Sequence, residues 1–112
     1  MIKSIDITGI KYEVNEKTRK YVEEKIGKLD KYAPVHAKKS MVADVKLAEV
    51  NRDHGNKYEV EVILQVPGRV ITAKDSTYNM MAAVDIVEAK LVGQLRRYKT
   101  ETRKRDLATK PA

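Results

Sequence analysis

The sequence predicts an α+β fold in which a four-stranded sheet carries two helices packed on one face, in the order β-α-β-β-β-α. Apolar residues recur at helical spacing in two stretches and alternate with polar residues in four others. The last three alternating stretches are separated only by short turns, which favours antiparallel pairing. Two amphipathic helices then need one shared sheet on which to bury their apolar sides.

The first strand and the first helix are expected in the first third of the chain. Alternation predicts a strand over residues 2–8, which Gly9 ends. A helix is expected over residues 15–32, with Asn15 as its N-cap and Pro34 as its stop. Its core-facing positions recur at helical spacing: Thr18, Val22, Ile26 and Leu29. The strands on either side of this helix should be parallel, with a right-handed connection.

Three further strands are expected over residues 40–50, 58–66 and 69–74. The turns between them are NRDHGN at residues 51–56 and the Pro67-Gly68 pair. In the first of these strands one face is apolar: Met41, Ala43, Val45 and Leu47. Without its first strand, the predicted order is that of a double-stranded-RNA-binding domain.

The last helix is expected from residue 77 to about 103, capped by Ser76 or Thr77. One stripe at helical spacing faces the core: Met80, Val84, Val87, Leu91, Leu95 and Tyr98. We expect a single domain over residues 1–105, followed by a disordered tail at 106–112.

Positive charge is concentrated near the end of the chain. The stretch Lys90–Arg105 holds seven Lys or Arg and one acidic residue, a net +6, while the whole chain of 112 residues carries +7. This excess indicates a polyanionic partner, nucleic acid first and an anionic membrane surface second. The chain has no cysteine, and no apolar run approaches membrane-spanning length, so we expect a soluble cytoplasmic protein.

Projection at 100° per residue places basic residues on solvent-facing sides of both helices. On the first helix these sides hold Lys17, Tyr21, Lys25, Lys28 and Lys31. On the last helix Lys90 and Arg97 lie two turns apart, and three more cations extend the charge toward the C-terminus: Arg96, Lys99 and Arg103. Two rows of cations suit phosphate backbones. The alternative is an ordinary solvated surface whose C-terminal cations favour the helix dipole.

No residue pattern predicts catalysis, a cofactor or a metal site. The histidines His36 and His54 are expected in or beside separate turns, and Asp53 beside His54 fits a solvated hairpin tip. Tyr21 and Tyr78 are candidates for stacking on bases, or for covering the edges of the core.

Several segments, taken in order, resemble the short ribosome hibernation-promoting factors, the family that also contains ribosome-associated inhibitor A, or protein Y. The segments cover about residues 2–99 and are IDITG, EVNEKTRKYVEEKIGKLDKY, PGRVITAKDS and NMMAAVDIVEAKLVGQLRRYK. The resemblance implies the same fold and binding to the small ribosomal subunit, in the channel between head and body. The protein would cover the places of mRNA and of the A- and P-site tRNAs, and so stop translation in stationary phase or stress.

The resemblance also implies which residues meet 16S rRNA, because the family uses basic helix residues against the RNA backbone. KIGKLDK supplies Lys25, Lys28 and Lys31, and the pattern KLxxQLxxxK supplies Lys90, Arg97 and Lys99. With the two cations added by the charge pattern, the expected rRNA-binding residues are Lys25, Lys28, Lys31, Lys90, Arg96, Arg97, Lys99 and Arg103.

The chain departs from the family pattern in two places. Asn79-Met80-Met81 stands where Asp-Met-Tyr is usual, and Val92-Gly93 where Glu-Arg is usual. One expected arginine contact is therefore missing, and Gly93 costs about 1 kcal/mol of helix stability relative to Ala. Arg96 and the cations at 103–105 are expected to compensate.

The end of the chain bears on the subtype. The chain ends where longer members of the family continue into a dimerising domain, and its end is basic. The resemblance therefore implies the short type, which favours pairing of ribosomes with a separate ribosome modulation factor.

The leading hypothesis is a monomeric, non-enzymatic translation inhibitor. A second hypothesis is a generic double-stranded-RNA-binding module, which would bind an isolated duplex as well as it binds a ribosome. A third is an enzyme such as a nuclease, which no feature of the sequence supports.

Overall fold

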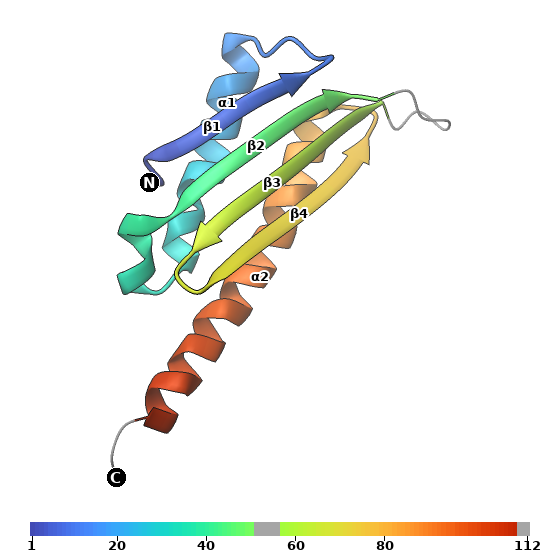
Figure 1. Ribbon diagram of the computed structural model, residues 1–112. Coiled ribbons are helices and arrows are strands. Elements are labelled where there is room, and N and C mark those ends of the chain that lie inside the picture. The colour runs from blue at the N-terminus through green and yellow to red at the C-terminus, as the bar shows by residue number, and fades with distance from the viewer. Residues whose placement is uncertain (51–56, 110–112) are drawn as a thin grey trace.

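The computed structural model describes residues 1–50 and 57–109, with side chains described up to Thr102. Its elements are β1 Ser4–Ile10, α1 Glu16–Gly27, the 3-10 helices η1 Lys28–Tyr32 and η2 Val35–Ser40, β2 Val42–Glu49, β3 Tyr58–Val66, β4 Arg69–Thr77 and α2 Met80–Thr109. Both α-helices cover one face of the sheet, and α2 continues past the edge of the sheet (Figure 1). The predicted α+β fold is confirmed. The expected turn at 51–56, with His54 and Asp53, lies outside the described residues.

The sheet has the strand order β1-β2-β3-β4. β1 pairs with β2 in parallel, whereas β2–β3 and β3–β4 are antiparallel, as predicted. At the β3–β4 hairpin Gly68 has φ 78°, the left-handed value that a Pro-Gly turn of type II requires at its second central position.

The core lies between the helical layer and the sheet. Every residue of the two predicted helical stripes is buried: Thr18, Val22, Ile26, Leu29, Met80, Val84, Val87, Leu91, Leu95 and Tyr98. The sheet contributes the buried face of each strand, including Val45, Leu47, Val62 and Leu64. Burying one such side chain contributes about 1.5–3 kcal/mol, so this shared layer fixes the positions of α1 and α2 relative to each other.

The predicted end of the first strand was wrong. β1 does not stop at Gly9, because its parallel pairing with β2 continues through Ile10, which lies opposite Ala48. The chain turns at Lys11 instead, which has φ 53°. At its other end the strand begins at Ser4, since the Ile2 N–H donates a 2.9 Å hydrogen bond to the carbonyl of Gly27 and lies outside the β1 ladder.

The helix boundaries also differ from the prediction. The expected helix over 15–32 changes at its end from α-helix to 3-10 helix, although Asn15 caps it as predicted by accepting a 2.8 Å bond from the Thr18 N–H. Neither Ser76 nor Thr77 caps α2, because both belong to β4; Asn79 does so by accepting from the Ala82 N–H at 3.1 Å.

The C-terminal helix is longer than the sequence pattern predicts. α2 continues through Thr109, so part of the expected disordered tail, residues 106–109, is helical. Neither Gly nor Pro interrupts the chain there before Pro111. Proline disfavours the α conformation of the residue before it, so Pro111 is the first residue in this part of the chain that is expected to end the helix.

Candidate nucleic-acid interface

α1 and η1 lie along α2 in a parallel arrangement, and we call this line of contact the helix seam. Near its start the Tyr21 hydroxyl donates a 2.6 Å hydrogen bond to Asp85, which raises the pKa of Tyr21 to about 12. Lys25 Nζ lies 3.6 Å from the same carboxylate and 4.0 Å from that of Glu88. Lys25 is therefore half-buried between two acids, and its charge helps to hold the helices together.

At the far end of the seam, cations from η1 and α2 converge on one aromatic ring. Lys31 Nζ lies 5.1 Å from the centroid of the Tyr32 ring, and the guanidinium carbon of Arg96 lies 5.4 Å from it. Each such contact contributes about 0.5–1 kcal/mol at an exposed site. One ring therefore contacts a cation from each helical segment, while both cations remain exposed to solvent.

Two more predicted residues belong to this region. Lys28 follows Lys25 on the same flank of the first helical segment, and Lys99 follows Arg96 by one turn of α2. Apart from Lys25, all of these cations are exposed, and within residues 1–50 and 57–102 none of the exposed ones forms an ion pair with a carboxylate. We call this set the cationic end: Lys28, Lys31, Arg96 and Lys99.

The opposite flank of α2 faces β4. Lys90 Nζ lies 2.9 Å from Asp75 Oδ2 and donates a 3.3 Å hydrogen bond to the carbonyl of Lys74. Gln94 donates a 2.7 Å bond to the carbonyl of Thr72 from the same flank. These contacts cover the free edge of β4. The hydrogen bond from Lys90 is the main cause that lowers the pKa of Asp75, and a second hydrogen bond, from the Ser76 N–H, lowers it further.

Arg97 also lies on the β4 flank, where it lines a hollow together with Arg69 and Glu101. The sequence pattern predicted Lys90 and Arg97 together on one solvent-facing side of the last helix, as part of one of two rows of cations. The structure turns that pair away from α1 and brings Arg96 to the helix seam. Arg103 belongs to α2, but its side chain lies outside the described part of the chain.

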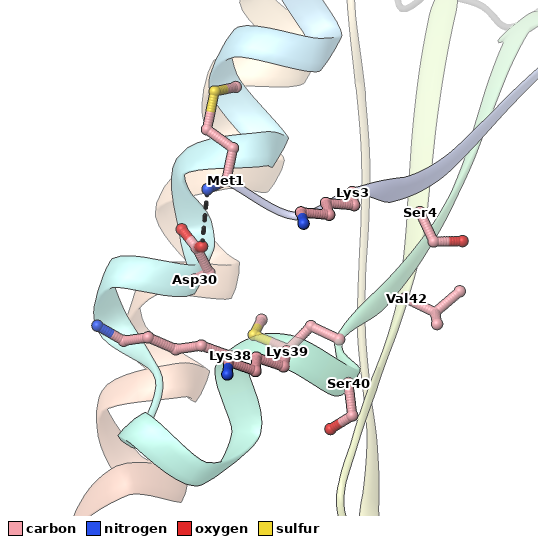
Figure 2. A pocket seen from close by; sticks show the side chains of 9 residues that line it. Met1, Lys3, Ser4, Asp30, Lys38, Lys39, Ser40 and Val42 are labelled. Atoms are coloured by element: carbon pink, nitrogen blue, oxygen red, sulfur yellow. Dashed lines mark ion pairs between the residues drawn. The ribbon is translucent and has the colours of Figure 1, made fainter.

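A second group of cations, which the sequence pattern did not predict, lies at the end of the sheet where β1 and β2 begin. Lys3, Lys38 and Lys39 line a pocket of about 560 Å³ beside Asp30, whose carboxylate lies 3.1 Å from the amino group of Met1 (Figure 2). The adjacent pair Lys38-Lys39 was the available signal, but only the fold brings it near Lys3.

The missed residue Arg69 has a different role. Its guanidinium carbon lies 5.5 Å from the centroid of the Tyr98 ring, and it pairs with Glu101. Tyr98 in turn donates a 2.9 Å hydrogen bond to the carbonyl of Pro67. This group ties the β3–β4 hairpin to α2 at the point where the helix leaves the sheet.

No set of three His, Asp or Glu side chains within the described residues is placed to hold a metal ion. His36 is exposed in η2. Among the helices of the described chain, none is both long enough and apolar enough to span a membrane.

The fold and these surfaces define a class: small α+β domains of order β-α-β-β-β-α whose two helices share one face of the sheet and present cations to solvent. Residues 5–103 match the family described as Sigma 54 modulation protein / S30EA ribosomal protein, and the chain belongs to that family. The resemblance found in the sequence is thereby confirmed.

Two relatives are named ribosome hibernation promotion factor. The protein from Deinococcus radiodurans is 35% identical over 108 residues, which cover 94% of this chain and 53% of that protein. The protein from Lactococcus lactis subsp. cremoris is 38% identical over 100 residues, 89% of this chain and 51% of that protein. The chain thus spans about half the length of these relatives.

Two solved structures share the fold. The protein Y N-terminal domain of Thermus thermophilus superposes with a TM-score of 0.73 at 26% identity, covering 85% of this chain and 98% of that domain. A ribosomal subunit interface protein from Coxiella burnetii gives a TM-score of 0.70 at 24% identity, covering 87% of this chain and 98% of that one. The comparison with a double-stranded-RNA-binding domain stays a prediction.

Proposed function

We propose that this domain is a ribosome hibernation factor that binds the small ribosomal subunit in the mRNA and tRNA channel and inhibits translation during stationary phase or stress. The observation that carries the proposal is the meeting of Lys31 and Arg96 on the Tyr32 ring, which joins the cations of both helical segments into one surface. The names of the relatives support the ribosomal role.

The physical basis is attraction to phosphate. A cation that neutralises a phosphate releases condensed counterions, which adds affinity and makes binding fall steeply with salt. Such contacts fix position without reading sequence, so the shape of the RNA channel would supply specificity. The cationic end suits this role because no carboxylate competes for its four charges within the described residues.

The other predicted residues contribute in a different way. Lys25 and Lys90 are each paired with acids, but their side chains remain 38% and 48% exposed. An ammonium group has three donors, so each lysine can hold its acid and still meet a phosphate. Arg97 and Arg103 would extend the contact along α2.

Several finer features belong to the same proposal. The RNA partner is 16S rRNA near the decoding centre, the protein acts as a monomer without catalysis or cofactor, and its ribosomal partner places it in the cytoplasm. Pairing of the bound ribosomes, as opposed to their storage as inactive monosomes, and the participation of a ribosome modulation factor stay predictions.

Sedimentation with ribosomes tests this function. Purified protein is added to ribosomes and to isolated small subunits, and sucrose gradients are run at low and high salt. Migration with the small subunit that high salt abolishes is expected, and a faster particle would support ribosome pairing. Excess RNA duplex serves as the competitor: if it removes the protein from small subunits as readily as unlabelled subunits do, the generic double-stranded-RNA-binding module replaces this proposal.

A further inference from the structure

Three tyrosines from separate parts of the chain meet at the end of the molecule opposite the cationic end. Tyr12 follows β1, Tyr58 begins β3, and Tyr78 lies in the link between β4 and α2. Together they line a pocket of about 450 Å³. Figure 1 shows that α1 and α2 both begin at this end of the sheet. This pocket lies outside every surface used by the proposed function.

Two of the rings are held in place. The centroids of Tyr12 and Tyr58 lie 6.0 Å apart with an angle of 79° between the planes, an edge-to-face pair. The Tyr12 hydroxyl lies 3.2 Å from that of Thr18, a buried residue of α1. The pair therefore forms a fixed, half-buried wall of the pocket.

The third ring is free to make contact. Tyr78 is 75% exposed, among the most exposed large hydrophobic side chains of the described residues. Burying an aromatic ring is favourable, so a ring left open to water beside two fixed rings offers a face for stacking with a planar ligand. Met80 and Met81, which also line the pocket, supply adaptable apolar contact beside it.

The polar lining selects the kind of planar ligand. Lys17, exposed in the first turn of α1, lines the pocket and forms no ion pair within the described residues. Asn79 uses its side-chain oxygen to cap α2, which leaves its amide NH₂ as a donor. Among the residues that the structure describes, no carboxylate lines the pocket, although Glu13 and Glu16 are near in sequence. An aromatic face, a cation and an amide donor together match a base that carries a phosphate.

We propose that this pocket binds an unpaired nucleotide of single-stranded RNA, with the base stacked on Tyr78 and Lys17 on the neighbouring phosphate. The choice of an RNA strand over a free nucleotide rests on charge: the chain is +7, and a strand brings several phosphates to a cationic protein, whereas a mononucleotide brings one group. A base-paired nucleotide cannot enter, because both its faces are already stacked within the duplex.

The test is the affinity of the full chain for a labelled oligouridylate, whose bases stack little on one another, measured by fluorescence anisotropy. Wild type, Tyr78→Ala and Tyr78→Phe are compared; the exposed position makes both variants compatible with the fold. We expect Tyr78→Ala to bind about tenfold or more weakly, the loss expected from one stacked base, and Tyr78→Phe to bind like wild type.

Two competitors identify the ligand. Uridine monophosphate and the same strand annealed to oligoadenylate should each displace the labelled strand poorly. Equal binding by Tyr78→Ala, or no binding by wild type, would overturn the site, and equal competition by the mononucleotide would overturn the assignment to RNA. Sedimentation of Tyr78→Ala with small subunits separates this proposal from the ribosomal one, because the cationic end is intact in that variant.

Discussion

The hydroxyl of Tyr21 and the carboxylate of Asp85 lie 2.6 Å apart although 64 positions separate them in the chain. Their hydrogen bond, with Lys25 on the same carboxylate, links α1 directly to α2 at the surface of the protein. The cationic end lies further along the helix seam, in η1 and α2. This link therefore helps to set the spacing of the cations that the proposed function uses.

Removing the Tyr21 hydroxyl should loosen the link without changing the fold. We expect Tyr21→Phe to lower the free energy of unfolding by about 1 kcal/mol, the usual net value of a hydrogen bond, because the ring and its packing stay. Urea unfolding at neutral pH measures this. A variant as stable as wild type would show that core packing alone holds the seam.

The same residue predicts a change at high pH. The pKa of Tyr21 is raised to about 12 from its ordinary 10.0, so the folded state holds this proton more tightly than the unfolded state does. Its contribution to stability is complete below pH 10.0 and is lost as the pH rises through 12. The difference in tyrosinate absorbance between wild type and Tyr21→Phe should have its midpoint near 12. A midpoint near 10.0 would contradict the hydrogen bond.

The ion pair between Lys90 and Asp75 predicts a change at low pH. In the folded state the pKa of Asp75 is lowered from its ordinary 3.8. The stability that the ionised carboxylate contributes is therefore complete above pH 3.8, and it is lost as the pH falls through the lower pKa of the folded state. Asp75→Asn should therefore be less stable than wild type at neutral pH, and the two should converge in strong acid. Urea midpoints across this range measure the difference, and a constant difference would argue against the ion pair.

Two glycines should respond in opposite ways to alanine. A Cβ on Gly93 would meet no atom within 4 Å, so Gly93→Ala should stabilise the protein by about 1 kcal/mol through helix propensity. A Cβ on Gly9 would lie 2.1 Å from the carbonyl oxygen of Tyr12, so Gly9→Ala should be clearly destabilising. Thermal unfolding of both variants measures this. A Gly93→Ala variant that unfolds at a lower temperature than wild type would contradict the open space around this position.

The fold could be predicted from the sequence because its signals are local. Alternation placed β3 at residues 58–66, and the stripe from Met80 to Tyr98 identified the buried side of α2. Boundaries were less predictable where a partner decides them: β1 passes Gly9 only because β2 lies beside it. The cap at Asn79 was missed for the same reason, since pairing with β3 extends β4 to Thr77.

The candidate site was predictable only in part. Helical projection gives the side on which a residue lies, but not the element that faces that side. It therefore placed Lys90 and Arg97 on one side of α2 but could not show that β4 faces that side, or that Lys25 meets two acids of α2. Tyr78 was already a candidate for stacking on bases, but the pocket beside it could not be predicted, because its three rings come from segments that only the folded sheet brings together.

The central claim is that the cationic end, rather than net charge, binds the small subunit. Lys28→Gln/Arg96→Gln removes two charges from that end. The matched control is Lys46→Gln/Lys74→Gln, which removes two charges from the open face of the sheet, where the lysines pair with Glu61 and Glu59. The side chains of Lys46 and Lys74 are 41% and 53% exposed, and a glutamine at either position can still donate a hydrogen bond to the facing carboxylate, so the control should remain folded.

Sedimentation of these two double variants with purified small subunits, at several salt concentrations, tests the claim most directly. We predict that the control sediments with the subunit as wild type does. The Lys28→Gln/Arg96→Gln variant should stay at the top of the gradient at salt concentrations where wild type still binds, because it has lost phosphate contacts that no other group supplies. Equal binding by both variants, or equal loss in both, would contradict the account.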